Sequence, residues 1–395
     1  MKTELFISWR YLVTKRKEKF ISLISVISIL GVAIGVMALI VVIAVMSGFD
    51  KDLRDKIVGN YSHITISGYK AIDMSEFEKI KKQIVVIPHV QGISPYIQGQ
   101  VLIKESERMF AVGLKGINPS TEQGVTKIKQ YLIKGDIDKL SLNDVIVGKE
   151  LALYLGLMPG SRLRIYSSPA GERDLKVAGI FNSGMYDYDL NLIFTDLATA
   201  RQLLGFDEEV TAIAVRLDNI YLADKVRQEM NKVLGFNYSI KTWIEQNQNF
   251  FAALKLEKLV MFIILTLIVL VASFNIISTL IVMVVEKTKD IGVLKALGMS
   301  ARGIRKIFTC EGLIIGMLGT FLGVISGLVT CGLLKKYQFI KLPQDIYYID
   351  RLPVSIDWPD ITLIILSAMF ITLISTIYPA AKAARLEPVE ALRYE

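Results

Sequence analysis

The residue types that carry most enzyme chemistry do not form the spacings that catalysis requires in this sequence. The Gly148-Lys149 pair is followed by Glu150, so it is not the glycine-rich loop that binds nucleotide phosphates. The sequence also lacks the His-Glu-x-x-His, Cys-x-x-Cys and Gly-x-Ser-x-Gly patterns of zinc, redox and hydrolase sites. We therefore predict no catalytic residue, no cofactor and no metal site in this chain.

Histidine and cysteine, the usual metal and redox ligands, are rare and widely separated. His63 and His89 have no cysteine or carboxylate pattern around them, which is typical of ordinary surface or strand histidines. Cys310 and Cys331 lie in or beside one apolar segment. On one helix they would be roughly 30 Å apart, too far for a disulfide. The long polar part of the chain has no cysteine, so it must fold by burial of apolar side chains alone.

The composition indicates membrane helices joined to a polar domain. Of the 395 residues, 52% are hydrophobic, which is more than soluble domains usually contain. Yet 21% are charged, too many for membrane helices alone. The net charge is +8, but basic residues of membrane proteins gather on the cytoplasmic side, so we predict no nucleic-acid partner.

Four runs without a charged residue are long enough to cross the roughly 30 Å of hydrocarbon in a bilayer. They cover residues 20–49, 259–285, 312–334 and 361–381. The first run is too long for a cleaved secretory signal and has no small-x-small cleavage site after it, so we interpret it as a retained span.

The distribution of Lys and Arg predicts the orientation. Residues 1–20 carry six basic and two acidic residues, residues 286–311 carry six basic residues, and residues 335–360 carry four of each. Basic flanks stay in the cytoplasm, so both termini and the 286–311 connection are predicted there, with 50–258 and the short 335–360 loop outside. Residues 1–19 mix apolar and basic side chains at helical spacing, which predicts an interfacial helix; residues 382–395 form the cytoplasmic tail.

The 50–258 segment alternates strand and helix patterns, so we predict a large α+β domain. The predicted strands are His63–Ser67, Gln100–Lys104, Met109–Gly113, Arg162–Tyr166, Leu175–Ile180, Leu190–Phe194 and Thr211–Leu217. A capping box at Ser75 and Glu78 predicts the start of a helix that runs to about Ile84. Further helices are predicted over 149–155, 197–204 and 221–234. Residues 116–205 could form an inserted subdomain. Residues 243–285 lack Pro and Gly, which favours one continuous helix over a break near Lys255–Lys258.

The 286–311 connection is predicted to contain a short amphipathic helix. Its apolar face is formed by Ile291, Leu294, Leu297 and Met299. Gly298 ends this helix, and Ser300 caps the helix that continues into the third span. Such a helix fits either a groove of a soluble partner or the lipid interface, and the residues alone favour neither.

Glycines spaced mostly four residues apart predict close packing of the membrane helices. They are Gly31 and Gly35 in the first span and Gly312, Gly316, Gly319, Gly323 and Gly327 in the third. We interpret them as helix-packing positions, within one chain or between two.

Several short segments, spread in order along nearly the whole chain, match one known pattern. They are residues 6–12 (Phe-Ile-Ser-Trp-Arg-Tyr-Leu), 45–49 (Val-Met-Ser-Gly-Phe), 183–189 (Ser-Gly-Met-Tyr-Asp-Tyr-Asp), 274–278 (Phe-Asn-Ile-Ile-Ser), 286–287 (Glu-Lys), 297–298 (Leu-Gly), 378–381 (Tyr-Pro-Ala-Ala) and, most specific, 388–395 (Pro-Val-Glu-Ala-Leu-Arg-Tyr-Glu). Together they resemble the FtsX-like permease superfamily, most closely the LolC/LolE permeases of the lipoprotein-releasing ABC transporter.

The resemblance implies a membrane location, a role and partners. Such permeases reside in the bacterial inner membrane, pair as homodimers or heterodimers, and bind two copies of a cytoplasmic ABC ATPase, which holds the ATP and Mg²⁺. They take lipid-anchored lipoproteins from the membrane and pass them to a soluble periplasmic carrier, so the α+β domain would be periplasmic. The implied contacts to the ATPase lie in a coupling helix at residues 286–299. They are Glu286, Lys287, Asp290, Ile291, Leu294, Lys295, Leu297 and Gly298.

The resemblance also implies a cavity for the acyl chains between the first and second spans of the two permeases. Met46 and Phe49 match the outer end of the first span, and Val42, Met261 and Leu265 are added on geometry. LolC-type members recruit the carrier through a protruding loop, whereas the corresponding residues 167–173 form a short stretch here. This chain is then the partner-type subunit, or it uses another surface such as Tyr186 and Tyr188.

Two other functions are compatible with the sequence. A permease of the same superfamily could transmit mechanical work to an efflux partner or a cell-wall hydrolase, as FtsX- and MacB-like permeases do. A membrane receptor that senses outside ligands without ATP would bind no ATPase at residues 286–299.

Overall fold

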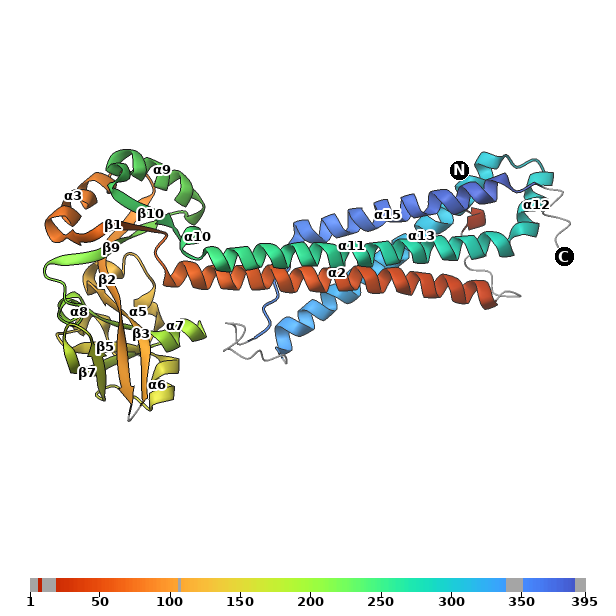
Figure 1. The fold of residues 1–395 in the computed structure, drawn as a ribbon. Helices are drawn as coiled ribbons and strands as arrows, with labels where there is room; N and C mark the ends of the chain where they lie inside the picture. The colour runs from red at the N-terminus through yellow and green to blue at the C-terminus, as the bar shows by residue number, and fades with distance from the viewer. Residues whose placement is uncertain (1–5, 9–18, 106–107, 339–350, 388–395) are drawn as a thin grey trace. The chain divides into compact units, whose positions relative to one another are not determined.

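The computed structural model describes residues 6–8, 19–105, 108–338 and 351–387 (Figure 1). These residues form two compact units. The membrane unit contains the described residues up to Asp50, 254–338 and 352–387, and the sheet domain contains Lys51–Ala253 and Arg351. The division falls within two long helices, α2 (Lys19–Asn60) and α11 (Gln248–Glu286).

The membrane unit is built from apolar helices. In the described part of the chain, α2, α11, α13 (Ala301–Tyr337) and α15 (Trp358–Arg385) are long and apolar enough to cross a membrane. This confirms the predicted class of integral membrane protein with four transmembrane helices. The helices extend beyond the charge-free runs because the charged residues that follow are themselves helical, as at Asp50–Asn60 of α2.

Two apolar clusters hold these helices together. In the first, Val32 and Ile40 of α2 pack with Leu280 of α11 and Ile315 of α13. The second surrounds α12 (Thr288–Ala296) and contains buried side chains from four helices. They are Val284, Ile291, Ile304, Ile307, Phe308, Ala380 and Ala383.

The sheet domain has one ten-stranded mixed sheet. Its order is β10-β1-β9-β2-β3-β8-β5-β7-β4, with β6 pairing with β2 and β7. The strands are β1 (Ile64–Asp73), β2 (Val90–Glu105), β3 (Arg108–Ile117), β4 (Leu132–Lys134), β5 (Asp144–Gly148), β6 (Arg162–Ser167), β7 (Gly171–Phe181), β8 (Leu192–Asp196), β9 (Glu209–Leu217) and β10 (Tyr238–Thr242). Residues 116–205, the suggested insertion, supply β4 to β8 of this sheet.

Helices accompany the sheet, so the α+β prediction is confirmed. They are α3 (Met74–Ile84), α4 (Pro119–Glu122), α5 (Ile128–Tyr131), α6 (Lys149–Leu155), α7 (Tyr186–Asn191), α8 (Leu197–Leu204), α9 (Ala223–Leu234) and α10 (Trp243–Gln246). The apolar core combines one face of the strands with buried side chains such as Phe77 of α3, Leu203 of α8 and Met230 of α9.

Two local predictions were wrong. The cap of α3 is Asp73, whose carboxylate accepts a hydrogen bond from the Ser75 amide at 2.7 Å, so Ser75 lies inside the helix. The continuous helix from residue 243 is interrupted at Asn247. A capping box of Thr242 and Glu245 opens the short α10, whose C-cap is Asn247, where the backbone leaves the helical conformation (φ −110°, ψ 35°). The following helix, α11, then runs without interruption through Lys255–Lys258.

Some predicted segments lie outside the described residues. Of the N-terminal interfacial helix only residues 6–8 are described, and these are helical. The described residues also leave out the tail motif at 388–395 and residues 339–350 of the short outside loop.

Candidate functional site

The first candidate site is α12, which follows α11 after Lys287. Its end has the geometry that the sequence predicted. Gly298 has φ +95°, its amide donates to the Lys295 carbonyl at 3.0 Å, and the Met299 amide donates to Leu294 at 3.0 Å. This pair of hydrogen bonds is the Schellman motif, which closes a helix at a left-handed residue. The Ser300 hydroxyl then accepts from the Gly303 amide and caps α13.

The two sides of α12 have different environments. Ile291 is buried in the chain's own apolar cluster, and Leu294 and Met299 pack against that cluster from its edge. In contrast, Leu297 is 80% exposed and Val293 is 47% exposed. The surface that α12 presents to a partner therefore contains Val293 and Leu297, whereas Ile291 holds α12 to its own protein.

The charged residues predicted at this segment have local partners. Lys287 is buried and lies 3.4 Å from the Asp290 carboxylate. The Lys295 ammonium donates to the carbonyls of Ala384 at 2.7 Å and Leu386 at 2.6 Å, at the end of α15. A lysine there satisfies carbonyls that a helix end leaves unpaired, so Lys295 fastens α12 to α15. Glu286, at the end of α11, and Gly298, next to Leu297 in the chain, are both exposed.

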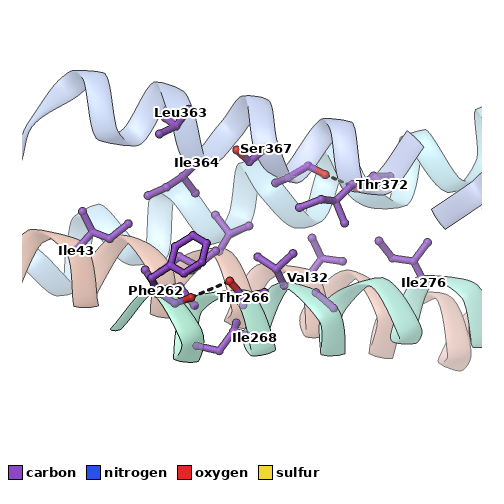
Figure 2. A pocket seen from close by; sticks show the side chains of 18 residues that line it. Val32, Ile43, Phe262, Thr266, Ile268, Ile276, Leu363, Ile364, Ser367 and Thr372 are labelled. Carbon is purple, nitrogen blue, oxygen red and sulfur yellow. Dashed lines mark hydrogen bonds between the residues drawn. The ribbon is translucent and has the colours of Figure 1, made fainter. Parts of the chain in front are cut away.

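The second candidate site is an apolar cavity of about 380 Å³ in the membrane unit (Figure 2). Its walls come from α2 between Val32 and Ile43, α11 between Phe262 and Ile276, and α15 between Leu363 and Thr372. The stretch of α2 corresponds to about 17 Å at 1.5 Å per residue. The lining therefore extends over a length comparable to that of a hydrocarbon chain.

Small residues leave space in this cavity, and hydroxyl groups bonded within their own helices add little polarity to its lining. A side chain at Gly35 would only begin to touch Ala272 and Ile268 at 3.9 Å, so this position leaves space open. Thr266 and Thr372 donate to carbonyls of their own helices at 2.7 and 2.8 Å, as Figure 2 shows for Thr266. Two of the three hydroxyls in the lining are thus already bonded and Ser367 supplies the third, so the lining is almost wholly apolar and suits an apolar ligand.

The residues predicted for the acyl cavity are only partly brought together. Leu265 of α11 lines the cavity, whereas Val42, Met46, Phe49 and Met261 are outside its lining. Near the end of that stretch of α2, residues 353–355 pack on the helix, with the Ser355 amide donating to the Ala44 carbonyl at 2.9 Å. Residues 363–372 of α15, which were not predicted at this site, form its third wall.

The glycines of α13 lie where it approaches two other helices. Gly312 and Gly316 lie against Thr376 and Thr372 of α15, respectively. The next three lie against α2: a Cβ added at Gly319 would be 2.7 Å from Val32, one at Gly323 would be 2.7 Å from the Ala33 carbonyl, and one at Gly327 would be 3.1 Å from Ile40. On α2, Gly31 lies against Asn275 of α11 and Gly35 lies near Ala272.

The possible carrier surface is largely turned inward. Tyr188 donates its hydroxyl to the Asn60 carbonyl at 3.2 Å and its ring packs edge-on against Tyr61 and Phe181. Burial raises its pKa well above the ordinary value. Tyr186 is half-buried at the start of α7. The 167–173 stretch is a tight β6–β7 hairpin in which Ser167 pairs with Gly171.

The 183–189 motif is organised by Asp189. Its buried carboxylate accepts hydrogen bonds from the Ser183 amide at 3.0 and 3.2 Å and from the Ser183 hydroxyl at 2.6 Å. Burial raises the pKa of this carboxyl to about 6, with the hydrogen bonds from Ser183 opposing that shift. The motif therefore has a structural role as a closed loop.

The histidines and acidic residues are placed as structural groups. His63 is buried and its Nδ1 accepts from the Leu217 amide at 3.0 Å, and burial lowers its pKa to about 4. His89 lies beside Asp218 at 3.1 Å. Among the residues that the structure describes, no group of three or more His, Cys, Asp or Glu could hold a metal ion.

Comparisons with known proteins agree with this architecture. Residues 25–233 match the MacB-like periplasmic core domain, and residues 262–388 match the FtsX-like permease C-terminal domain. Lipoprotein-releasing system transmembrane protein LolC from Xylella fastidiosa is 36% identical over 98% of both chains. LolC from Neisseria meningitidis is 32% identical and LolE from Haemophilus influenzae 28% identical, each over 99% of both chains. The chain therefore belongs to the family of lipoprotein-releasing system transmembrane proteins that includes LolC and LolE.

Proposed function

We propose that this chain is the permease subunit of an ABC transporter that extracts lipid-anchored lipoproteins from the bacterial inner membrane. It hands them to a periplasmic carrier. The observation that carries the proposal is the apolar cavity between α2, α11 and α15. The names of the relatives LolC and LolE, which refer to lipoprotein release, support the class of cargo.

The energetics of an acyl chain explain why such a cavity is needed. Each methylene that moves from hydrocarbon into water costs about 0.8 kcal/mol. A chain of sixteen carbons moved bare into water would therefore cost roughly 12 kcal/mol, and a lipoprotein anchor carries more than one chain. An apolar cavity shelters the chain on its way out, and the remaining cost requires an energy source.

The energy source in this proposal is a separate cytoplasmic ATPase, present in two copies, which holds ATP and Mg²⁺. The sequence has no phosphate-binding loop of its own. The ATPase binds the exposed side of α12, where Val293 and Leu297 offer apolar surface to a groove. Both termini then lie in the cytoplasm, and a second permease subunit, identical or related, completes the membrane part.

The test places a bulky side chain inside the cavity and compares it with the same side chain just outside the cavity. Ala272→Phe adds a ring inside the cavity, and Val271→Phe adds the same ring on the exposed neighbouring position of α11. We expect Ala272→Phe to slow the release of lipoproteins from inner-membrane spheroplasts, with Val271→Phe close to wild type. Normal release after depletion of the protein would refute the proposal.

A second candidate is mechanical transmission to an efflux partner or a cell-wall hydrolase. The match of residues 25–233 to the MacB-like periplasmic core domain favours it. Replacing residues 51–253 by the domain of another permease and identifying the proteins that co-purify separates the two. Transmission predicts that the co-purifying partner changes with the domain that replaces residues 51–253. It also predicts that the Ala272→Phe variant and the wild type release lipoproteins equally.

A further inference from the structure

The sheet domain contains a cavity of about 670 Å³ that shares no residue with the membrane cavity or with α12. One wall is the outer face of β2 and β3, and the others are α7 with its flanking residues and the parts of α2 and α11 that belong to the sheet domain. This volume lies within the range of sites for ligands of several hundred daltons. The lining combines amides, aromatic rings and small residues.

Side-chain amides in this cavity are spaced like the main chain of a peptide. Gln98 and Gln100 of β2 are exposed and point to the same face because they are two residues apart in a strand. Two residues of strand span roughly 6.8 Å, the repeat of any other extended chain. Within the described residues, neither side-chain amide makes a hydrogen bond, and the same holds for Asn191 across the cavity. Each amide offers two donors and an acceptor.

The edge of β3 contributes unpaired main chain to the same cavity. β8 pairs with β3 only from Gly113 to Ile117, so within the described strands residues 108–112 have no partner on that side. Ala111, which lies in this part of β3, is exposed and lines the cavity. An open strand edge accepts an extended peptide as an additional strand.

The remaining lining suits a neutral, partly apolar segment. Ala111 and Gly113 are small and keep the face of β3 open, with Gly113 directly opposite Gln100. Tyr61 and Phe250 supply aromatic surface. In the described lining, Asp187 is the one charged residue, which disfavours an anion such as a lipid phosphate.

We propose that this cavity binds an extended polypeptide, the segment of the cargo that joins its lipid anchor to its folded part. The inference rests on the proposed function, because that function supplies the cargo. A folded domain has already paired its main-chain groups, whereas an extended segment offers free N–H and C=O groups. Those groups match the amides of Gln98, Gln100 and Asn191 and the open edge of β3.

The experiment uses the intact transporter in native inner-membrane vesicles and a reporter lipoprotein. The reporter consists of a lipidated cysteine, a short linker and a folded fluorescent protein. A photo-cross-linking residue replaces Gln100, or as a matched control Gln91, which is exposed on the same strand outside the cavity. Mass spectrometry locates the cross-linked peptide, and release of the reporter to the carrier is followed in parallel.

We expect cross-links from position 100 to the linker and none from position 91. The Gln98→Ala/Gln100→Ala double variant loses two hydrogen bonds, so reporter release at limiting reporter should fall at least about fivefold, whereas Gln91→Ala should match wild type.

The outcomes separate the two proposals. Cross-links from position 100 to the folded part of the reporter or to the carrier, or no cross-link while release is normal, would overturn the peptide site and leave the transport function. A linker cross-link without release by the wild-type transporter would retain the peptide site and overturn the transport function. Neither cross-link nor release would overturn both.

Discussion

Replacing Leu297 by Asp tests the link between α12 and an ATPase. Leu297 lies at the end of α12, is 80% exposed, and is followed by Gly298, which closes the helix. An exposed substitution of this kind changes folding stability by about 0.5 kcal/mol or less. The fold of the permease should therefore survive, and any lost binding would come from the docking surface.

The size of the effect follows from burial of this side chain in the complex. Full burial of a leucine contributes about 1.5–3 kcal/mol, and Asp at the same place forfeits that and adds the cost of taking a charge out of water. A loss of about 3 kcal/mol in binding free energy corresponds to a roughly hundredfold weaker Kd. Leu297→Ala should lose only the apolar part, roughly tenfold or somewhat more.

The assay is a titration of the purified ATPase onto the permease in lipid nanodiscs, with thermal unfolding of each permease variant as a check on folding. Leu153→Asp is the matched control, because Leu153 is 67% exposed on α6 of the sheet domain. Leu294→Asp is a poor substitute, since Leu294 packs against the chain's own apolar cluster and its loss would disturb the permease itself.

A wild-type Kd for the Leu297→Asp variant would refute the assignment of α12 as the docking element. Equal weakening by Leu153→Asp would show that the assay reports general damage or surface charge. Weakening by Leu297→Asp alone, with unchanged thermal unfolding, is the result that the geometry requires.

Three further changes test the packing and the ionisation of the chain. Gly319→Leu should lower the thermal stability of the membrane unit by about 1–3 kcal/mol through overpacking against Val32, whereas Gly332→Leu, where a side chain meets nothing within 4 Å, should be nearly neutral. The raised pKa of Asp189, about 6 against 3.8, means that its folded form holds a proton more tightly than its unfolded form. As the pH rises from about 4 to 6, the unfolding free energy of wild type should therefore fall by up to about 3 kcal/mol relative to that of Asp189→Asn, measured by denaturant titration at each pH. The same pH dependence in both proteins would contradict the raised pKa of Asp189. Lys295→Met removes the donor to two carbonyls at the end of α15. The free energy of opening of α12 should therefore fall by about 1–3 kcal/mol, measured as faster hydrogen exchange of the α12 amides. Unchanged exchange would show that Lys295 does not fasten α12.

The membrane spans were predictable because hydropathy and length decide them locally. The charge-free run 20–49 identifies a span, but α2 continues to Asn60, because polar residues at helical spacing extend a helix as readily as apolar ones. The sheet domain was predictable in class and in seven of its strands. β4, β5 and β10 were missed, as they are short and derive their order from pairing with distant strands.

The candidate sites show the same limit from the other direction. Periodicity placed Ile291, Leu294 and Leu297 on an apolar face of α12, yet it cannot tell which part of that face its own protein covers. Ile291 is buried against α13 and α15 and Leu297 is exposed, a difference set by tertiary packing. For the acyl cavity, the predicted residues lie on α2 and α11, whereas the third wall comes from α15, about a hundred residues further along the chain. Such a contact leaves no local signal in a single sequence.

The packing of the helices indicates which wall of the cavity can move. In the most apolar 18-residue stretch of each helix, 39% of residues are buried in α13 but only 6% in α11. The glycines of α13 hold α2 and α15 close to it, so those two walls are fastened to one helix. α11 is the wall with the fewest buried residues, and it is separated from α12 only by Lys287. Under the proposed function, a push on α12 would reach α15 through Lys295 as well as α11 through the chain, and α11, with the fewest buried residues, is the wall that close packing holds least.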